Sequence, residues 1–225
     1  MAIAMSEPCR LYLISPPLIP DAGRFVESMK AAFSGGDAAC FQLRLKSPDG
    51  VAATDDEILK TAAALLPVAR AAGVHFVIND RPDLAKRAGA DGVHIGQKDS
   101  SLHEARKILG EGATIGVTCH NSYDLAMRAG EAGADYVAFG AFFPTETKDA
   151  PLRADVSIIA DWTLATTLPC VAIGGLTAEN CGDVVRAGAD FIAVSSAVWR
   201  AGDGPAAAVR RLNEAIAAAS AMRHG

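Results

Sequence analysis

Aromatic residues, basic charge and long apolar runs are all scarce in this sequence. Only 6% of the 225 residues are aromatic although 50% are hydrophobic, so the core has to be built mainly from Ala, Val, Leu and Ile. The formal net charge is -5 and the Lys and Arg residues are scattered, which excludes the basic footprint that nucleic-acid binding requires. No segment is long and apolar enough to predict a membrane span.

Paired cysteines are missing as well. The cysteines are odd in number, widely separated and without a Cys-x-x-Cys pair; they are Cys9, Cys40, Cys119, Cys170 and Cys181. This pattern argues against a disulfide framework and a zinc site, and we expect reduced thiols in a cytoplasmic protein. The first residues lack the basic and apolar stretches of a signal peptide. We expect residues 1–8 to form a loose tail on one domain that spans residues 1–225.

Short β-branched runs alternate with Ala-rich segments of helical periodicity along the whole chain. The expected strands are Leu11–Ile14, Cys40–Leu43, His75–Ile78, Gly92–Ile95, Thr114–Val117, Tyr136–Phe139, Cys170–Ile173 and Phe191–Val194. The expected helices are Phe25–Phe33, Asp55–Ala72, Pro82–Ala88, Leu102–Leu109, Ser122–Ala132, Ser157–Thr163, Ala178–Ala187 and Pro205–Ala219. Eight strand–helix pairs predict an α/β fold, a single (β/α)8 TIM barrel. An open, doubly wound sheet is the alternative, but no Gly-x-Gly-x-x-Gly motif follows the first strand.

A weak internal repeat of the form Ala-Gly-Ala-Asp supports this count of strands. It occurs at residues 88–91, 132–135 and 187–190, each time between an expected helix and an expected strand, and residues 34–37 are a looser copy. A helix often ends at a residue with positive φ, which glycine adopts at no steric cost. We therefore interpret the glycines of the repeat as structural.

Polar residues that follow the strands are the functional candidates, because TIM barrels carry their chemistry at the carboxyl ends of the strands. After the second expected strand, Gln42, Arg44 and Lys46 alternate with leucines, which predicts three polar side chains on one face. Cations that face the mouth of a barrel need an anion, because burying unpaired charge is costly. Solvated charges at an exposed edge are the alternative interpretation.

Two carboxylates follow the next two expected strands. The third strand ends in Asn79-Asp80, and Asp99 lies in the loop after the fourth. Carboxylates that converge at neighbouring strand ends repel each other, and a Mg²⁺ ion relieves this repulsion while it keeps positions open for phosphate oxygens. Alternatively, Asp80 caps the helix that begins at Pro82.

The fourth and fifth expected strands offer weaker candidates. His94 stands alone within an apolar strand, and we interpret it as a hydrogen-bonded core residue. Thr118 follows the fifth strand, where its hydroxyl either bonds a phosphate oxygen or steers the turn. Cys119 and His120 are adjacent, so they point in different directions and do not predict a cysteine–histidine mechanism.

The last three strands are followed by residues typical of phosphate binding. Thr145, Thr147 and Lys148 place two hydroxyls and an ammonium in the loop after the sixth strand, and the polar stretch behind them is a candidate lid. Gly174-Gly175 follows the seventh strand, and Ser195-Ser196 follows the eighth. Barrels often bind phosphate between these two loops, through backbone N–H groups, and a purely structural glycine turn is the alternative.

Taken in order, these motifs resemble those of the thiamine phosphate synthase family. They are Gln42-Leu-Arg-x-Lys46, Asn79-Asp80, Asp91-Gly-Val-His-Ile-Gly-Gln-x-Asp99, Pro144-Thr-Glu-Thr-Lys148 and Ala172-Ile-Gly-Gly175, within a similarity that extends from Leu11 to Val198. The chain departs from the family pattern at Thr118 in place of Ser, Ala141 in place of Pro and Leu176 in place of Ile. The loop at residues 149–155 also lacks the glycine that the pattern leads us to expect near Ala154.

The resemblance implies a Mg²⁺-dependent transferase of thiamine biosynthesis with two small phosphorylated substrates. It implies that the pyrimidine pyrophosphate contacts Gln42, Arg44, Lys46, Asn79, Thr118 and Lys148. It implies that Mg²⁺ is held by Asp80 and Asp99, and that the thiazole phosphate is received by Thr145, Thr147, Gly175, Ser195 and Ser196. Arg44, Lys148 and Thr118 form the expected catalytic set, and a homo-oligomer is compatible with the resemblance.

The implied reaction needs no protein nucleophile. The C–O bond to pyrophosphate ionises, the aminopyrimidine stabilises the methylene cation, and the thiazole nitrogen captures it. A thiazole tautomerase on the same fold is the nearest rival, but a proton shift has no use for a metal and cation set. A phosphate-binding barrel without catalytic activity is a rival from another class.

Overall fold

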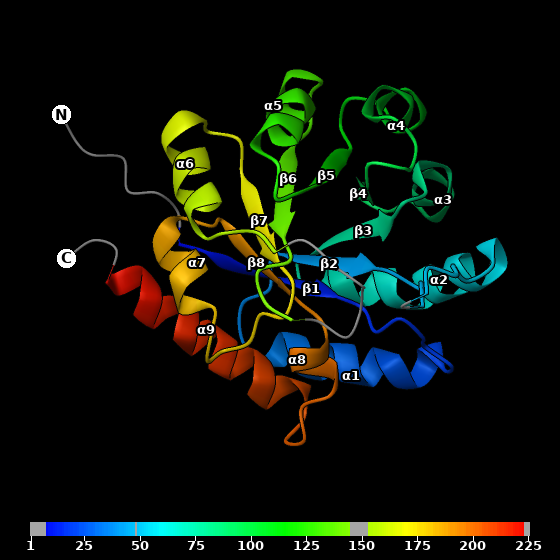
Figure 1. Cartoon of the computed structure of the whole chain (residues 1–225). Coiled ribbons are helices and arrows are strands. Elements are labelled where there is room, and N and C mark those ends of the chain that lie inside the picture. The colour runs from blue at the N-terminus through cyan, green and yellow to red at the C-terminus, as the bar shows by residue number, and fades with distance from the viewer. Residues whose placement is uncertain (1–7, 48, 145–152, 223–225) are drawn as a thin grey trace.

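Eight parallel strands close into a barrel in the order β1 to β8, and each strand is followed by at least one helix (Figure 1). The computed structural model describes residues 8–47, 49–144 and 153–222. The strands are β1 (Arg10–Ile14), β2 (Cys40–Leu43), β3 (His75–Asn79), β4 (Gly92–Ile95), β5 (Thr114–His120), β6 (Tyr136–Gly140), β7 (Cys170–Ile173) and β8 (Phe191–Val194). The helices are α1 (Ala22–Ser34), α2 (Asp55–Ala71), α3 (Pro82–Ala88), α4 (Leu102–Leu109), α5 (Tyr123–Glu131), α6 (Ser157–Ala165), α7 (Gly182–Ala187), α8 (Ser196–Trp199) and α9 (Pro205–Ala221). The predicted TIM barrel is confirmed.

The barrel contains two separate apolar layers. The larger one packs outward-facing side chains of the strands, such as Leu11 and Phe41, against the surrounding helices. The smaller one fills the interior of the barrel and includes Val77, Tyr12 and Tyr136. The two tyrosines are only 3% and 7% exposed, so their hydroxyl groups need hydrogen-bond partners inside the barrel.

The Asp of the internal repeat ties neighbouring strands together at the amino-terminal end of the barrel. Asp91 donates its backbone N–H to the carbonyl oxygen of Phe76 at 2.9 Å, and its Oδ2 accepts the N–H of Phe76 at 2.8 Å. The same pair of bonds joins Asp135 to Ile115 and Asp190 to Cys170. In this way β3 is tied to β4, β5 to β6, and β7 to β8.

In the looser copy of the repeat, the Asp carboxylate bonds to a side chain of the neighbouring strand and not to its backbone. Asp37 accepts two hydrogen bonds of 2.7 Å from the guanidinium of Arg10, at the start of β1. The repeat glycines have the positive φ expected of them, with 68° at Gly89 and 111° at Gly188, where they end α3 and α7. The interpretation of these glycines as structural is confirmed.

The structure departs from the predicted elements near α7. The helix begins at Gly182, whereas the sequence pattern predicts its start at Ala178. Asn180 explains the difference, because its side chain accepts the N–H of Thr177 at 2.8 Å and donates to the carbonyl of Gly175 at 2.9 Å. Such side-chain bonds offer the backbone an alternative to a helical turn. The short helix α8 is not predicted by the sequence pattern.

Strand β5 is longer than predicted and irregular. It extends to His120, and its register against β6 shifts between Thr118 and His120. His120 has a φ of 54°, which is unusual for a residue with a side chain. Bulges of this kind turn a side chain to a new direction and are common beside active sites.

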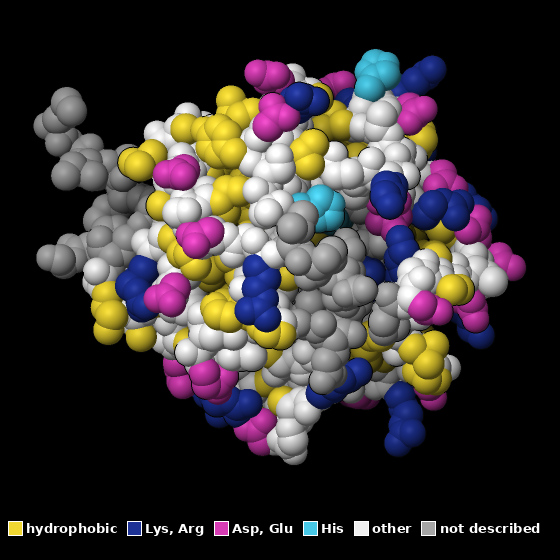
Figure 2. All heavy atoms as spheres, in the orientation of Figure 1, with side chains coloured by type: hydrophobic (Ala, Val, Ile, Leu, Met, Phe, Trp, Pro, Cys, Tyr) yellow, Lys and Arg dark blue, Asp and Glu magenta, His cyan; other side chains and the backbone are white. Residues whose placement is uncertain are grey.

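The charges on the surface shown in Figure 2 are interspersed, and Lys and Arg side chains alternate there with Asp and Glu. This distribution agrees with the scattered basic residues of the sequence. Among the described residues, no helix is long and apolar enough to cross a membrane. Of the predicted N-terminal tail, residues 1–7 lie outside the described residues.

Candidate active site

Cations that follow β2 meet a carboxylate that follows β3 at the carboxyl end of the barrel. Lys46 Nζ lies 2.6 Å from Asp80 Oδ2, and the two side chains are only 28% and 20% exposed. The N–H of Arg44 donates to Ser15 Oγ at 2.9 Å, and the Arg44 guanidinium donates to the carbonyl of Lys46 at 3.1 Å. Burial lowers the pKa of Arg44 and the charge of Asp80 opposes this shift, but a guanidinium stays protonated at neutral pH.

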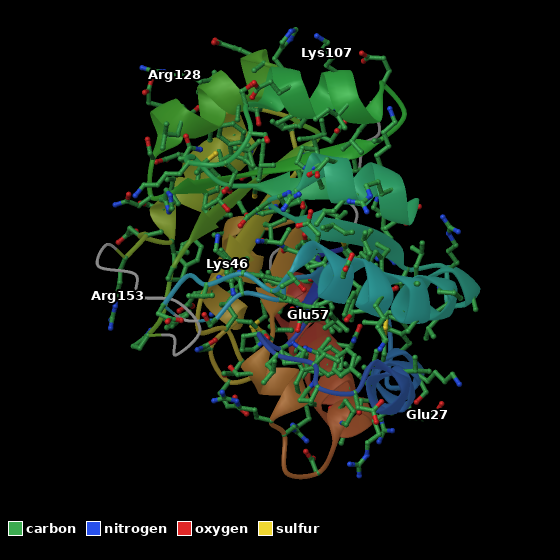
Figure 3. The ribbon with its side chains drawn as sticks, turned by 90° about the vertical axis from the view of Figure 1, so that its right-hand side faces the viewer. Glu27, Lys46, Glu57, Lys107, Arg128 and Arg153 are labelled. Atoms are coloured by element: carbon green, nitrogen blue, oxygen red, sulfur yellow. The ribbon has the colours of Figure 1, made fainter. Side chains whose placement is uncertain are left out.

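Figure 3 shows where these cations lie relative to others. Lys46 is near the centre of that view, beyond the end of β2, whereas Lys107 and Arg128 project outward from α4 and α5. The Lys46 side chain is only 28% exposed and is paired with Asp80, so its charge is not simply solvated. The interpretation of Lys46 as a solvated edge charge does not hold.

A second carboxylate adjoins the first. Asp99 lies within hydrogen-bond reach of Asp80, and Asp99 Oδ2 accepts the N–H of Gly96 at 2.7 Å. Burial raises the pKa of Asp99; the Gly96 N–H and the Lys46 charge oppose this shift, and the neighbouring Asp80 carboxylate adds to it. The Asp99 carboxylate therefore lies beside both Asp80 and the ammonium of Lys46, and the neighbouring negative charge makes ionising Asp99 costly.

Asp80 and Asp99, the acid pair, line a cavity of about 370 Å³ between the ends of β2, β3 and β4 and the start of α2. Lys46 and Asn79 also line it, and its remaining wall is largely apolar, with Leu45 and Ile58 among the lining residues. Within the described ranges there is no group of three or more His, Cys, Asp or Glu side chains placed to hold a metal ion. Mg²⁺ does not need one, because it is commonly bound by one or two carboxylates together with substrate phosphates and water. The donor set of this cavity suits Mg²⁺ and a phosphorylated ligand.

Asp80 does not cap α3. The N-cap residue of that helix is Arg81, whose side chain makes no capping hydrogen bond and instead pairs with Asp55 and Asp83. Asp80 itself has a φ of 63°, a conformation that places it outside the helix and allows its carboxylate to reach Lys46. The capping alternative is therefore wrong, and the positive φ marks strain held at the mouth of the barrel.

Gln42 and Asn79 lie side by side below the acid pair. Gln42 is 3% exposed and its Nε2 donates to Asn79 Oδ1 at 2.6 Å. On its other side, Gln42 Oε1 accepts the hydroxyl of Tyr12 at 3.1 Å. Both predicted residues are thus held by hydrogen bonds inside the barrel, and Asn79 also lines the cavity of the acid pair.

Thr118 is held from two sides. Its Oγ1 lies 2.8 Å from His94 Nε2, and its carbonyl accepts the side-chain amide of Gln97 at 2.7 Å. His94 is 7% exposed, and its Nδ1 lies 2.9 Å from the hydroxyl of Tyr136. The interpretation of His94 as a hydrogen-bonded core residue is confirmed.

Three of the five residues predicted to receive the second phosphate, Gly175, Ser195 and Ser196, lie at the ends of β7 and β8. Gly175 has a φ of 64°, and a Cβ there would meet the carbonyl oxygen of Pro144 at 2.3 Å, so only glycine allows this approach of the two loops. Ser196 is exposed at the start of α8, while the Ser195 hydroxyl donates to the carbonyl of Ser15 at 3.1 Å.

Three predicted residues, Thr145, Thr147 and Lys148, lie outside the described residues, as does most of the predicted lid. A hollow of about 530 Å³ lies between the starts of α5 and α6 and is larger than the cavity at the acid pair. Within the described part of the chain, none of the predicted site residues lines it. The smaller cavity is the better candidate, because it gathers convergent polar groups and a perturbed carboxyl.

A family model described as "Thiamine monophosphate synthase" matches residues 11–198. The chain belongs to this family. The thiamine monophosphate synthase match covers β1 from Leu11 onward, the other seven strands in full, and every described residue of the acid pair and its cavity.

Relatives of high identity bear thiamine-phosphate synthase names. The "Thiamine-phosphate synthase" of Rhodospirillum centenum is 52% identical over 208 residues, which are 92% of this chain and 98% of the relative. That of Hyphomonas neptunium is 51% identical over 207 residues, which are 91% and 92% of the two chains. The solved structure of thiamine phosphate pyrophosphorylase from Pyrococcus furiosus has a TM-score of 0.79 at 30% identity and covers 93% of this chain and 96% of its own.

For this thiamine monophosphate synthase family member, reasoning from the sequence missed the residues that hold the site from below. Tyr12 and Tyr136 lie inside the barrel and are bonded to Gln42 and His94. The available signal was the alternation of side chains along a strand, which places both tyrosines at inward-facing positions, as it does Gln42. This alternation alone does not predict which inward-facing residues contact one another across the barrel.

Proposed function

We propose that the chain catalyses the thiamine-phosphate synthase reaction of its family, in which a pyrimidine methyl pyrophosphate and a thiazole phosphate combine and pyrophosphate is released. The observation that carries this proposal is the acid pair of Asp80 and Asp99 beside Lys46 and Arg44 at the mouth of a barrel. Opposed, partly buried charges of this kind suit a leaving group that gains negative charge as its bond breaks.

The pyrimidine pyrophosphate binds over β2 to β5 in this proposal. Its anionic end meets Arg44, Lys46 and Lys148, and its ring end meets Gln42, Asn79 and Thr118. Asp80 and Asp99 are the residues that would hold Mg²⁺. When bound, Mg²⁺ neutralises charge on the pyrophosphate and on the two carboxylates.

The thiazole phosphate binds at the other side of the mouth. Gly175, Ser195 and Ser196 offer backbone N–H groups at the ends of β7 and β8, with Thr145 and Thr147 from the loop after β6. Supporting this assignment, Gly175 holds the β6 and β7 loops in close contact, where a side chain would push them apart. Barrels commonly bind phosphate at this place.

The two proposed substrate sites place the departing pyrophosphate and the attacking thiazole nitrogen at the same methylene carbon. The C–O bond breaks with its electron pair going to pyrophosphate, the aminopyrimidine stabilises the methylene cation, and the thiazole nitrogen forms the new C–N bond. Arg44 and Lys148 stabilise the charge of the leaving group, and Thr118 is the third member of the proposed catalytic set. No protein nucleophile takes part.

The rival reactions suit the site less well. A thiazole tautomerase moves one proton and has no need of an acid pair beside two cations. A phosphate-binding protein without catalytic activity would not need two substrate sites that converge. We further propose that the enzyme works in the reducing cytoplasm, in line with five buried cysteine thiols, and that it forms homo-oligomers.

Incubation of the chain with both phosphorylated halves, with Mg²⁺ or with a chelator, tests the proposal directly. Formation of thiamine phosphate and pyrophosphate in equal amounts, only with Mg²⁺, is the expected result. Arg87→Ala, on the outer end of α3, is a matched control for Arg44→Ala. Absence of thiamine phosphate at any Mg²⁺ concentration would refute the reaction, and equal rates with the chelator would refute the metal.

A further inference from the structure

A chain of hydrogen bonds crosses the interior of the barrel from β5 to β3. Its six members come from six different strands and are, in order, Thr118, His94, Tyr136, Tyr12, Gln42 and Asn79. Its five bonds measure 2.8, 2.9, 2.8, 3.1 and 2.6 Å. The two ends lie at the mouth, and the four residues between them are each at most 7% exposed.

All five bonds of this hydrogen-bond chain donate in a fixed direction, which the amide of Asn79 determines. Asn79 helps to line the cavity of the acid pair, and the negative charge there favours an amide that presents its N–H groups to the cavity and turns its carbonyl inward. The carbonyl therefore turns inward and accepts from Gln42 Nε2, which leaves Gln42 Oε1 to accept the hydroxyl of Tyr12. Tyr12 has only one proton, so the Tyr136 hydroxyl must donate to it at 2.8 Å.

The same reasoning fixes His94. The Tyr136 proton is used on Tyr12, so the Tyr136 oxygen accepts from His94 Nδ1–H. Burial raises the pKa of both phenols well above their usual value, which keeps both protons in place. A neutral imidazole with a proton on Nδ1 has a bare Nε2, so Thr118 donates its own proton there.

Gly116 shows that the barrel makes room for this chain. Gly116 lies on β5, opposite Tyr136 in the register, and a Cβ at this position would meet Tyr136 Cζ at 1.9 Å. Its φ is not in the left-handed region, so the glycine is needed for space and not for its backbone conformation. The ring of Tyr136 fills that space, 5.6 Å from the ring of His94 and tilted 27° to it.

We propose that His94, Tyr136 and Tyr12 are positioning residues that commit the Thr118 hydroxyl to accept, and the Asn79 amide to donate, a hydrogen bond at the mouth of the barrel. The partner of Thr118 is therefore an N–H donor. The pyrimidine pyrophosphate carries its N–H groups on the exocyclic amine, so Thr118 recognises the ring and not the pyrophosphate. Recognition of the ring by Thr118 rests on the proposed function, whereas the direction of the hydrogen-bond chain does not.

The direction is measurable without substrate. The ¹⁵N NMR signals of His94 in the wild-type protein should show a neutral ring with the proton on Nδ1, because a protonated and a bare ring nitrogen differ widely in shift. Tyr136→Phe removes the acceptor of this proton, and Tyr12→Phe removes the acceptor of the Tyr136 proton. Both variants should move the proton to Nε2. An Nε2–H ring or a cationic ring in the wild type would overturn the proposal.

Kinetics then test the role in recognition. Tyr136→Phe and Tyr12→Phe should raise KM for the pyrimidine pyrophosphate on the order of tenfold, as expected for one misdirected buried hydrogen bond. KM for the thiazole phosphate should not change. Tyr123→Phe, on α5 outside the barrel and packed on Trp162, is the matched control and should behave as the wild type. Thermal melting of each variant separates folding from recognition.

Inhibition by inorganic pyrophosphate distinguishes the two ends of the substrate. Thr118→Val should weaken binding of the pyrimidine pyrophosphate while it leaves the inhibition constant of pyrophosphate unchanged, and Thr118→Ser should restore binding. A weaker pyrophosphate inhibition in Thr118→Val would overturn the assignment to the ring, as would kinetics of Tyr136→Phe equal to those of Tyr123→Phe. A wild type that makes no thiamine phosphate would refute the proposed function and leave the NMR result standing.

Discussion

Replacing Gly116 by alanine should force the ring of Tyr136 out of its place in the barrel. The new Cβ would lie 1.9 Å from Tyr136 Cζ, and ordinary contact begins at 3.4 Å, so the ring has to move by about 1.5 Å. Such a shift breaks the hydrogen bonds of Tyr136 to Tyr12 and His94, of 2.8 and 2.9 Å. Overpacking costs roughly 1–3 kcal/mol and each orphaned buried polar group roughly 1–3 kcal/mol more.

We therefore expect a loss of at least about 3 kcal/mol in the free energy of unfolding, or roughly 6–12 °C in Tm for a chain of this length. Calorimetry of Gly116→Ala beside Gly112→Ala measures it. Gly112 has open space where its Cβ would be and an ordinary φ, so its alanine variant should melt near the wild type. Tyr136→Leu should make the Gly116→Ala change nearly harmless. Equal melting of the two alanine variants would refute the steric reasoning.

Arg44→Ala and Lys148→Ala should each lower kcat on the order of a hundredfold, because each removes a contact to the leaving group, and near-normal turnover in steady-state assays would remove both roles. Asp91→Ala should lower the free energy of unfolding by about 1–3 kcal/mol in urea titrations, relative to the exposed control Asp161→Ala, because it removes a charge-assisted bond that holds β3 to β4. Asp99→Asn should raise Tm at pH 7 in Mg²⁺-free buffer. The pKa of Asp99 is raised in the folded protein, so the ionised carboxylate destabilises the fold. The difference in Tm between the variant and the wild type should vanish at a pH below the ordinary carboxyl pKa, where Asp99 is protonated in both the folded and the unfolded protein.

Local patterns in the sequence were sufficient for most of the fold. The start of α4 at Leu102 follows from Ser101 and Glu104, which form a capping box, and α2 begins in the same way after Thr54. The start of α7 could not be predicted this way, because Asn180 bonds to neighbouring backbone groups only in the folded loop. The short α8 lacks any side-chain cap and is too short for a periodic pattern.

The same division holds for the site. Asp80 and Asp99 follow strands that are neighbours in both sequence and space, so their approach was predictable from the strand order alone. The contact of Tyr12 with Tyr136 joins residues 124 positions apart, on β1 and β6. It depends on the register of the whole barrel and on the space left by Gly116, neither of which a local pattern contains.

The Asp bonds at the foot of the barrel have a consequence for how the molecule assembles and changes. The carboxylate bonds of Asp91, Asp135 and Asp190 span only 15 or 20 positions of the chain, so closing each one orders a short loop at small entropic expense. Pairs of strands can therefore be joined early, while the bonds of Tyr12 to Tyr136 and of Ser195 to Ser15, between residues 124 and 180 positions apart, must wait for later strands. The sequences of the loops at the mouth can then change during evolution with little effect on folding, because the Asp residues that join the strands lie at the opposite end of the barrel.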